Sequence, residues 1–148
     1  MKALYTAKAT AQGGRDSSVK TEDGTIDFDL SIPKGLGGPG GKGANPEQFF
    51  AAGYSACYGS ALAHVAREHK IDLGDYTVTA TVKIGKNEDD MFQLAVILDS
   101  YLPTVDTETG EMLVNEAHEV CPYSRATQDN IDVTLNLLLD SDDDGEEE

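Results

Sequence analysis

Hydrophobic and polar residues alternate along several stretches of the chain, as expected for β-strands with one buried face. The stretches are 25–32, 76–85, 91–100 and 131–139, with a weaker one over 3–11. The short polar segment 87–90 joins the second and third, so we expect these two to form an antiparallel hairpin.

The hydrophobic period lengthens to three or four residues in two places, which predicts helices. The first helix is expected to begin at Asn45 as N-cap, followed by Pro46 and Glu47, and to end near His69 or Lys70. It is rich in Gly, Ala and Ser, which indicates that another element packs very close to it.

A second helix is expected over 108–120, ending where Cys121 precedes Pro122. Its apolar side carries Leu113, Ala117 and Val120. The order of strands, helix and strands predicts an α+β fold, with antiparallel sheets packed around a central cysteine-bearing helix. A chain of 148 residues is one domain of ordinary size, so we expect a single domain over 1–139.

The formal charge of −16 arises from 27 acidic against 11 basic side chains. Nucleic acids and anionic membranes both require Lys and Arg, so neither is expected as a partner. Residues 140–148 contain seven acids and no base, which predicts a disordered acidic tail. Without the tail the balance is still −9, which would suit solubility in concentrated salt.

No export signal or membrane segment is expected. Residues 1–20 contain no apolar run preceded by basic residues, and no stretch approaches 18 uninterrupted apolar residues. We therefore expect a cytoplasmic protein. Two cysteines are too few for a disulfide scaffold, and a cytosolic pair is more often catalytic, redox-active or metal-binding.

Neither a phosphate-binding loop nor a zinc site is expected. The glycine-rich segment 35–43 has Leu36 and Gly43 where the P-loop pattern needs Gly and Ser or Thr, so a mobile loop bordering a site, or a plain linker, is the better interpretation. His64 follows Cys57 by seven residues, about 10 Å along a helix, which is too far for one tetrahedral ion. No metal and no cofactor are predicted.

Cys57 lies on the apolar face in the middle of the first helix. A reactive thiol needs a nearby positive charge and access for its oxidant, and a position in the middle of a helix supplies no charge. The residues alone leave both an inert buried thiol and a reactive one open.

Three segments carry a resemblance to a known family. They are GGRD at 13–16, NPEQFFAAGYSAC at 45–57 and VCPYSRATQDNIDV at 120–133. Together they resemble the organic hydroperoxide resistance proteins (organic hydroperoxide reductases) of the osmotically inducible protein C superfamily, over nearly all of residues 1–139. Ser17 departs from the family, in which a glycine commonly follows the Arg-Asp pair.

The resemblance implies an intertwined homodimeric thiol peroxidase. Cys57 would be the peroxidatic residue, Cys121 the resolving one, Arg15 the cation that stabilises the thiolate and Glu47 the carboxylate that orients Arg15. Organic hydroperoxides would be reduced to alcohols through a sulfenic acid and a disulfide, with dihydrolipoamide or lipoylated proteins as reductant.

Four aromatic residues are candidates for an apolar substrate pocket that would favour alkyl or lipid hydroperoxides over hydrogen peroxide. They are Phe49, Phe50, Tyr54 and Tyr123. The same rings would equally suit a hydrophobic core.

The spacing of Glu47 and Cys57 adds an inference of its own. Ten residues of continuous helix separate them by about 15 Å, so they cannot share a site directly. We therefore expect a dimer with two composite sites, in which Glu47 and Arg15 come from the other chain, unless the helix breaks at Gly53.

Two other functions stay open at this point. One is a thiol peroxidase for general peroxide or osmotic stress, which prefers smaller oxidants. The other is a redox-sensing lipid-binding protein, which would be oxidised without turning over.

Overall fold

The computed structural model describes residues 1–139. The acidic segment 140–148, predicted as a tail, lies outside the described residues. The chain divides into two units, residues 1–49 and the residues from 50 onward, and each is described by itself. The single domain over 1–139 stays a prediction.

The first unit contains a three-stranded antiparallel sheet. Its strands, in spatial order, are β1 (Ala9–Gln12), β2 (Ser18–Thr21) and β3 (Asp27–Asp29). The weak strand expected over 3–11 thus begins later than predicted, at Ala9, and the strand expected over 25–32 covers only Asp27–Asp29. Strand β2 was not predicted, because SVKT lacks the alternation of a longer strand and is defined by its pairing with both neighbours.

The glycine-rich loop between β3 and α1 is a folded part of the first unit. It contains the short 3-10 helix η1 (Lys34–Leu36), and Leu30 forms a bridge with Ala44. A Cβ on Gly43 would lie 2.5 Å from the backbone of Leu30, so this position admits only glycine. Of the two interpretations, a plain linker is therefore wrong.

Helix α1 (Pro46–Glu68) confirms the predicted start and comes within two residues of the predicted end. The Asn45 side chain accepts a hydrogen bond from the Gln48 N–H (2.9 Å), and the Gln48 side chain accepts one from the Asn45 N–H (3.1 Å). This reciprocal capping box satisfies two backbone donors at the helix start. The helix continues without a break through Gly53.

The second unit contains a mixed sheet with β5 in its centre. Strands β4 (Thr77–Lys86) and β5 (Phe92–Tyr101) form the predicted antiparallel hairpin, and β6 (Asp132–Leu138) pairs with β5 in parallel. The α+β class is confirmed, but the expectation of purely antiparallel sheets is wrong for β5 and β6. The reason is the helical crossover between them, which returns the chain to the end of the sheet where β5 began.

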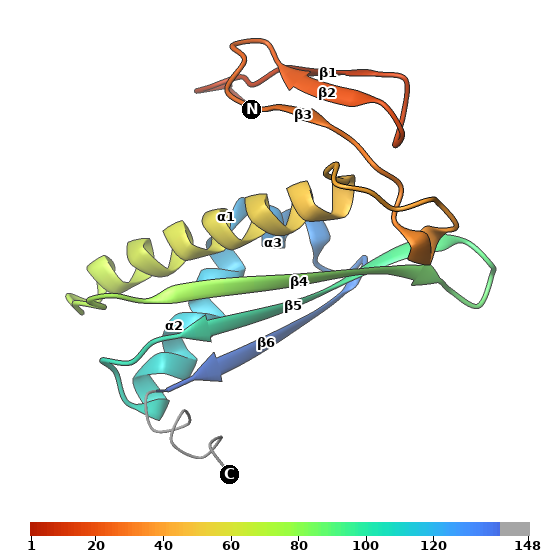
Figure 1. The fold of residues 1–148 in the computed structure, drawn as a ribbon. Helices are drawn as coiled ribbons and strands as arrows, with labels where there is room; N and C mark the ends of the chain where they lie inside the picture. Colours follow the sequence, from red (N-terminus) through yellow and green to blue (C-terminus); the bar gives the residue numbers. More distant parts are fainter. Residues whose placement is uncertain (140–148) are drawn as a thin grey trace. The chain divides into compact units, whose positions relative to one another are not determined.

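The crossover consists of α2 (Thr107–Val120) and α3 (Pro122–Thr127). Figure 1 shows β4, β5 and β6 side by side, with α2 leaving the end of β5. Helix α2 matches the predicted 108–120 to within one residue, but Val120 is exposed, and α3 was not predicted. Pro122 ends one helix and opens the next, since its fixed φ suits a first helical position.

The core of the second unit lies between the helices and one face of the sheet. Most of its fully buried members come from α1, β5 and α2, among them Tyr54, Tyr58, Leu62, Leu98 and Leu113. Within residues 1–139, none of the helices has the length and apolar character needed to cross a membrane.

Candidate active site

The two cysteines, 64 residues apart in sequence, lie side by side in the second unit. Cys121 Sγ lies 3.5 Å from Cys57 Sγ, and both are free thiols. Cys57 comes from the middle of α1, and Cys121 from the junction of α2 and α3. Two thiols at this separation need only small side-chain movements to reach the bond length of about 2.05 Å of a disulfide.

Cys121 occupies a rigid corner. It is both the C-cap of α2 and the N-cap of α3, with φ −65° and ψ 124°. Its N–H donates to the carbonyl of Ala117 (2.9 Å), and its carbonyl accepts from the N–H of Arg125 (2.9 Å). The corner therefore fixes the backbone from which the Cys121 side chain extends.

The two thiols differ in access and in acidity. Cys57 is half-buried, whereas Cys121 is completely buried. Burial raises the pKa of Cys57 above its ordinary value, a hydrogen bond from the backbone of Tyr123 opposes the rise, and the neighbouring Cys121 adds to it. With these neighbours alone Cys57 is a neutral thiol at pH 7, so activation requires a positive charge.

Arg15 and Glu47 form a bidentate ion pair within the first unit. Arg15 Nη1 and Nη2 donate to Glu47 Oε1 and Oε2, each at 2.8 Å. The pair lowers the pKa of Glu47 and raises that of Arg15, in both cases chiefly through the hydrogen bonds. A guanidinium held by two parallel bonds is a positive charge of fixed orientation.

The aromatic candidates divide between the two units. Phe49 contacts Phe28 in the first unit, with ring centroids 5.8 Å apart. Phe50, Tyr54 and Tyr123 form a cluster in the second, with centroid separations of 5.6 to 5.9 Å. Tyr54 belongs to the buried core, whereas Tyr123 is 36% exposed. The pocket role of all four stays a prediction.

A chain of buried hydroxyl groups beside the cysteines was missed by the sequence analysis. Tyr54 Oη lies 2.8 Å from Ser124 Oγ and 3.2 Å from Thr127 Oγ1, and His118 Nδ1 lies 2.8 Å from Ser124 Oγ. Ser124 and Thr127 stand three residues apart in the segment CPYSRAT, and this helical spacing of two small hydroxyl residues was the available signal.

Comparison with known proteins identifies the relatives of this chain. The family model described as OsmC-like protein matches residues 38–136. The chain is 47% identical to the organic hydroperoxide resistance protein OhrB of Bacillus subtilis, over 91% of this chain and 98% of the relative. It is 47% identical to the organic hydroperoxide resistance protein of Xanthomonas axonopodis pv. citri, over 92% of this chain and 96% of that one.

Solved structures agree with this comparison. An organic hydroperoxide resistance protein from Elizabethkingia anophelis is 49% identical and superposes with a TM-score of 0.89, covering 95% of this chain and 100% of that one.

Proposed function

The chain belongs to the OsmC-like protein family, and on that premise we propose that it is an enzyme that detoxifies organic hydroperoxides. Relatives that cover nearly the whole chain are named for resistance to these compounds. The observation that carries the proposal is the pair of free thiols 3.5 Å apart. Their proximity suits a two-cysteine peroxidase cycle.

In the first step, the Cys57 thiolate attacks the outer peroxide oxygen. The O–O bond breaks, the alkoxide takes up a proton and leaves as the alcohol, and Cys57 becomes a sulfenic acid. The half-buried position of Cys57 suits this step, because the peroxide must reach the sulfur. Burial of alkyl carbon against Phe50 and Tyr123 would favour organic peroxides, since hydrogen peroxide gains nothing from an apolar wall.

In the second step, Cys121 attacks the Cys57 sulfur. The S–O bond breaks as the S–S bond forms, and the oxygen leaves as water with the proton of the Cys121 thiol. A dithiol of the dihydrolipoyl type then restores both thiols by exchange. The reductant must attack one of the two disulfide sulfurs. Because Cys121 is completely buried and Cys57 is half-buried, the attack is expected at the sulfur of Cys57. A cytoplasmic location fits a cycle that depends on a dithiol reductant.

Activation of Cys57 is proposed to come from a second chain. Glu47 and Cys57 are ten residues apart on the unbroken α1, about 15 Å along its axis. An intertwined homodimer in which Arg15 and Glu47 of one chain lie beside Cys57 of the other would supply the missing positive charge. Arg15 would lower the pKa of Cys57, and Glu47 would orient the guanidinium.

The first experiment mixes the reduced protein with cumene hydroperoxide or hydrogen peroxide at equal concentration and follows loss of the Cys57 thiol in a single turnover. We expect the organic peroxide to react much faster and mass analysis to find a Cys57–Cys121 disulfide. Turnover with dihydrolipoamide distinguishes an enzyme from a sensor. Reaction no faster than that of a free thiol would refute the proposal, with Cys57→Ser as the unreactive control.

A second experiment tests the composite site. Chains carrying Arg15→Ala and chains carrying Cys57→Ser are unfolded together and refolded as a mixture. Random pairing makes about half of the refolded dimers mixed. If the sites are composite, each mixed dimer has one intact site out of two, so about a quarter of the wild-type activity returns. Sites built within one chain would stay inactive in the mixture, as would either variant refolded alone.

A further inference from the structure

We propose that Ser124, held between Tyr54 and His118, is a positioning residue that keeps Cys121 within reach of Cys57 while the disulfide closes. The inference deepens the proposed peroxidase function and rests on it. Ser124 touches neither sulfur in the hydrogen-bond network, so its role is to hold the corner that carries Cys121.

The hydroxyl chain spans the two segments that carry the cysteines. Tyr54 stands one helical turn before Cys57 on α1, and Ser124 stands one turn after Cys121 on α3. His118 stands one turn before Cys121 on α2. Because Ser124 Oγ bonds to both of the other side chains, one buried atom connects all three helices around the thiol pair.

Counting protons gives the chain a direction. The Thr127 hydroxyl donates its one proton to the carbonyl of Ser124 (3.2 Å), so in its contact with Tyr54 it accepts. Tyr54 then donates to Thr127, and Ser124 must donate to Tyr54. Ser124 in turn accepts from Nδ1–H of His118. Every hydroxyl in the chain donates once. Loss of the Tyr54 hydroxyl therefore leaves the buried Ser124 donor without an acceptor, and loss of the Ser124 hydroxyl leaves Nδ1–H of the half-buried His118 without one.

Disulfide closure is the step that depends most on this arrangement. The sulfurs must approach from 3.5 Å to about 2.05 Å. Because Cys121 is completely buried, its sulfur reaches Cys57 only from the position in which the corner holds it. Closure competes with further oxidation of the Cys57 sulfenic acid to sulfinic acid by a second peroxide molecule. A displaced Cys121 therefore gives peroxide more time to overoxidise Cys57.

The test uses Ser124→Ala and Tyr54→Phe, which remove one hydroxyl each and keep the packing carbon. The rate of disulfide closure is measured after a single peroxide equivalent, and the sulfinic acid fraction at excess peroxide, by mass analysis. We expect each variant to close the disulfide about tenfold more slowly, since small misplacements of reacting groups have effects of this size or larger. The sulfinic acid fraction should rise in parallel.

The double variant separates positioning from a general loss of stability. If Ser124 and Tyr54 act as one chain, the double variant closes no more slowly than either single variant. Matched controls are Ser100→Ala, a completely buried serine on β5 outside the chain, and Tyr76→Phe, a half-buried tyrosine whose hydroxyl donates to the carbonyl of Gly59 (2.9 Å). Both remove one hydroxyl and should close at the wild-type rate.

The outcomes distinguish the inference from the proposed function. Absence of a sulfenic acid or disulfide in the wild-type protein overturns the proposed function. Normal disulfide formation in the wild type together with wild-type closure rates in Ser124→Ala and Tyr54→Phe overturns the positioning role alone. Slower closure that is additive in the double variant, or shared by the two controls, also overturns it.

Discussion

At position 53 of α1, a glycine faces the ring of Tyr123. A Cβ at Gly53 would lie 2.7 Å from the Tyr123 hydroxyl and 3.2 Å from the ring, so the tyrosine would have to move. Tyr123 stacks on Phe50, and its backbone bonds to Cys57. The missing side chain at Gly53 thus determines how the aromatic cluster lies beside the candidate nucleophile.

We expect Gly53→Ala to slow the reaction of Cys57 with bulky hydroperoxides more than with hydrogen peroxide, because it displaces Tyr123. Its control is Gly59→Ala on the same helix, where the new Cβ would meet only Val78, at an ordinary 3.8 Å. Gly59→Ala should raise the free energy of unfolding by about 1 kcal/mol through helix propensity, and Gly53→Ala by less. Urea denaturation and single-turnover rates measure the two effects, and equal behaviour of both variants would contradict the prediction.

The ion pair of Arg15 and Glu47 predicts a pH-dependent contribution to stability. Arg15 lowers the pKa of Glu47 below its ordinary 4.5, so the folded state favours the ionised carboxylate. The contribution is fully present above pH 4.5 and is lost as the pH falls through the lowered pKa. The difference in unfolding free energy between wild type and Glu47→Gln should therefore shrink on acidification, as measured by urea denaturation at several pH values.

Glu22→Gln is the control for this measurement. Glu22 pairs with Lys8 at 3.8 Å, and both side chains are exposed, so removal of this carboxylate should have little effect at any pH. A difference for Glu47→Gln that stays constant from pH 7 to about pH 3 would show that the variant acts through packing.

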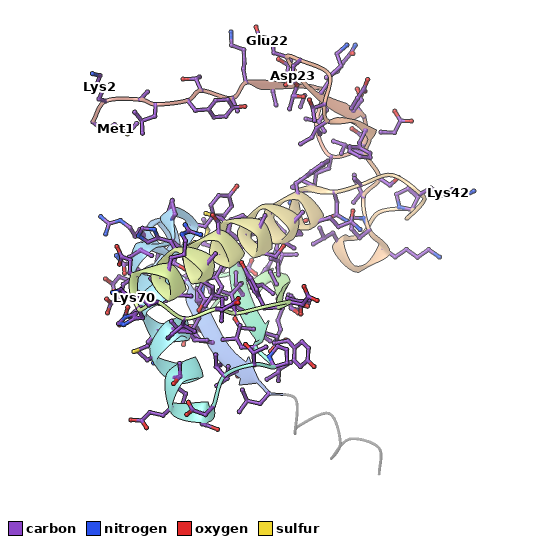
Figure 2. All side chains as sticks on the ribbon, turned by 90° about the vertical axis from the view of Figure 1, so that its left-hand side faces the viewer. Met1, Lys2, Glu22, Asp23, Lys42 and Lys70 are labelled. Atoms are coloured by element: carbon purple, nitrogen blue, oxygen red, sulfur yellow. The ribbon has the colours of Figure 1, made fainter. Side chains whose placement is uncertain are left out.

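Among the elements, α1 has specific signals at both ends. The capping box of Asn45 and Gln48 begins it, and a Schellman motif ends it, in which Ile71 N–H donates to Ala66 C=O (2.8 Å) and Lys70 N–H to Arg67 C=O (3.0 Å). Lys70 adopts the left-handed conformation, with φ +60°, at the end of the helix where Figure 2 labels it. Glycine would adopt this conformation without steric cost.

Lys70→Gly should raise the free energy of unfolding by about 0.5 to 1 kcal/mol. The substitution removes the steric cost of the left-handed conformation in the folded state, and the greater conformational entropy of glycine in the unfolded chain offsets part of this gain. Lys70→Ala is the matched control, since it removes the charge and keeps the Cβ. Thermal and urea denaturation compare the three proteins. An equal gain from both substitutions would mean that the charge at this position, rather than its backbone, limits stability.

For the whole molecule, the dominant feature is the formal charge of −16. Repulsion among acidic groups disfavours the compact state, and salt screens the repulsion between groups that are farther apart than the Debye length, which is about 30 Å at 0.01 M and 3 Å at 1 M. Figure 2 labels two of these acids, Glu22 and Asp23, which extend from the turn between β2 and β3.

We expect the midpoint of thermal unfolding to rise with KCl, most steeply at low concentration where the Debye length changes most. The physical reason is that screening removes repulsion among the acidic side chains. Sucrose at equal osmolality is the control, because it does not screen charge and should not reproduce the steep initial rise. A midpoint that is independent of salt would contradict the prediction and show that repulsion among the acidic side chains contributes little to the free energy of unfolding.

Local signals made a large part of this architecture predictable. Asn45 and Pro46 marked the start of α1 to the residue, and alternation placed the hairpin of β4 and β5 within one residue. Helix α3 and strand β2 escaped prediction, because each is short and depends on its neighbours for stability. The parallel pairing of β5 and β6 could not be derived from alternation, which is the same in both kinds of sheet.

The sequence by itself determined the elements that depend on residues a few positions apart: caps, helical faces and the hairpin. It also determined which residue types are available for chemistry, with two cysteines and the motifs around them. Only the tertiary structure decided that the sulfurs of Cys57 and Cys121 meet at 3.5 Å and that Ser124 connects three helices beside them. The contacts of Cys57 with Cys121 and of Tyr54 with Ser124 join residues more than 60 positions apart, and they exist only because packing of the whole core repays the entropy of closing long loops.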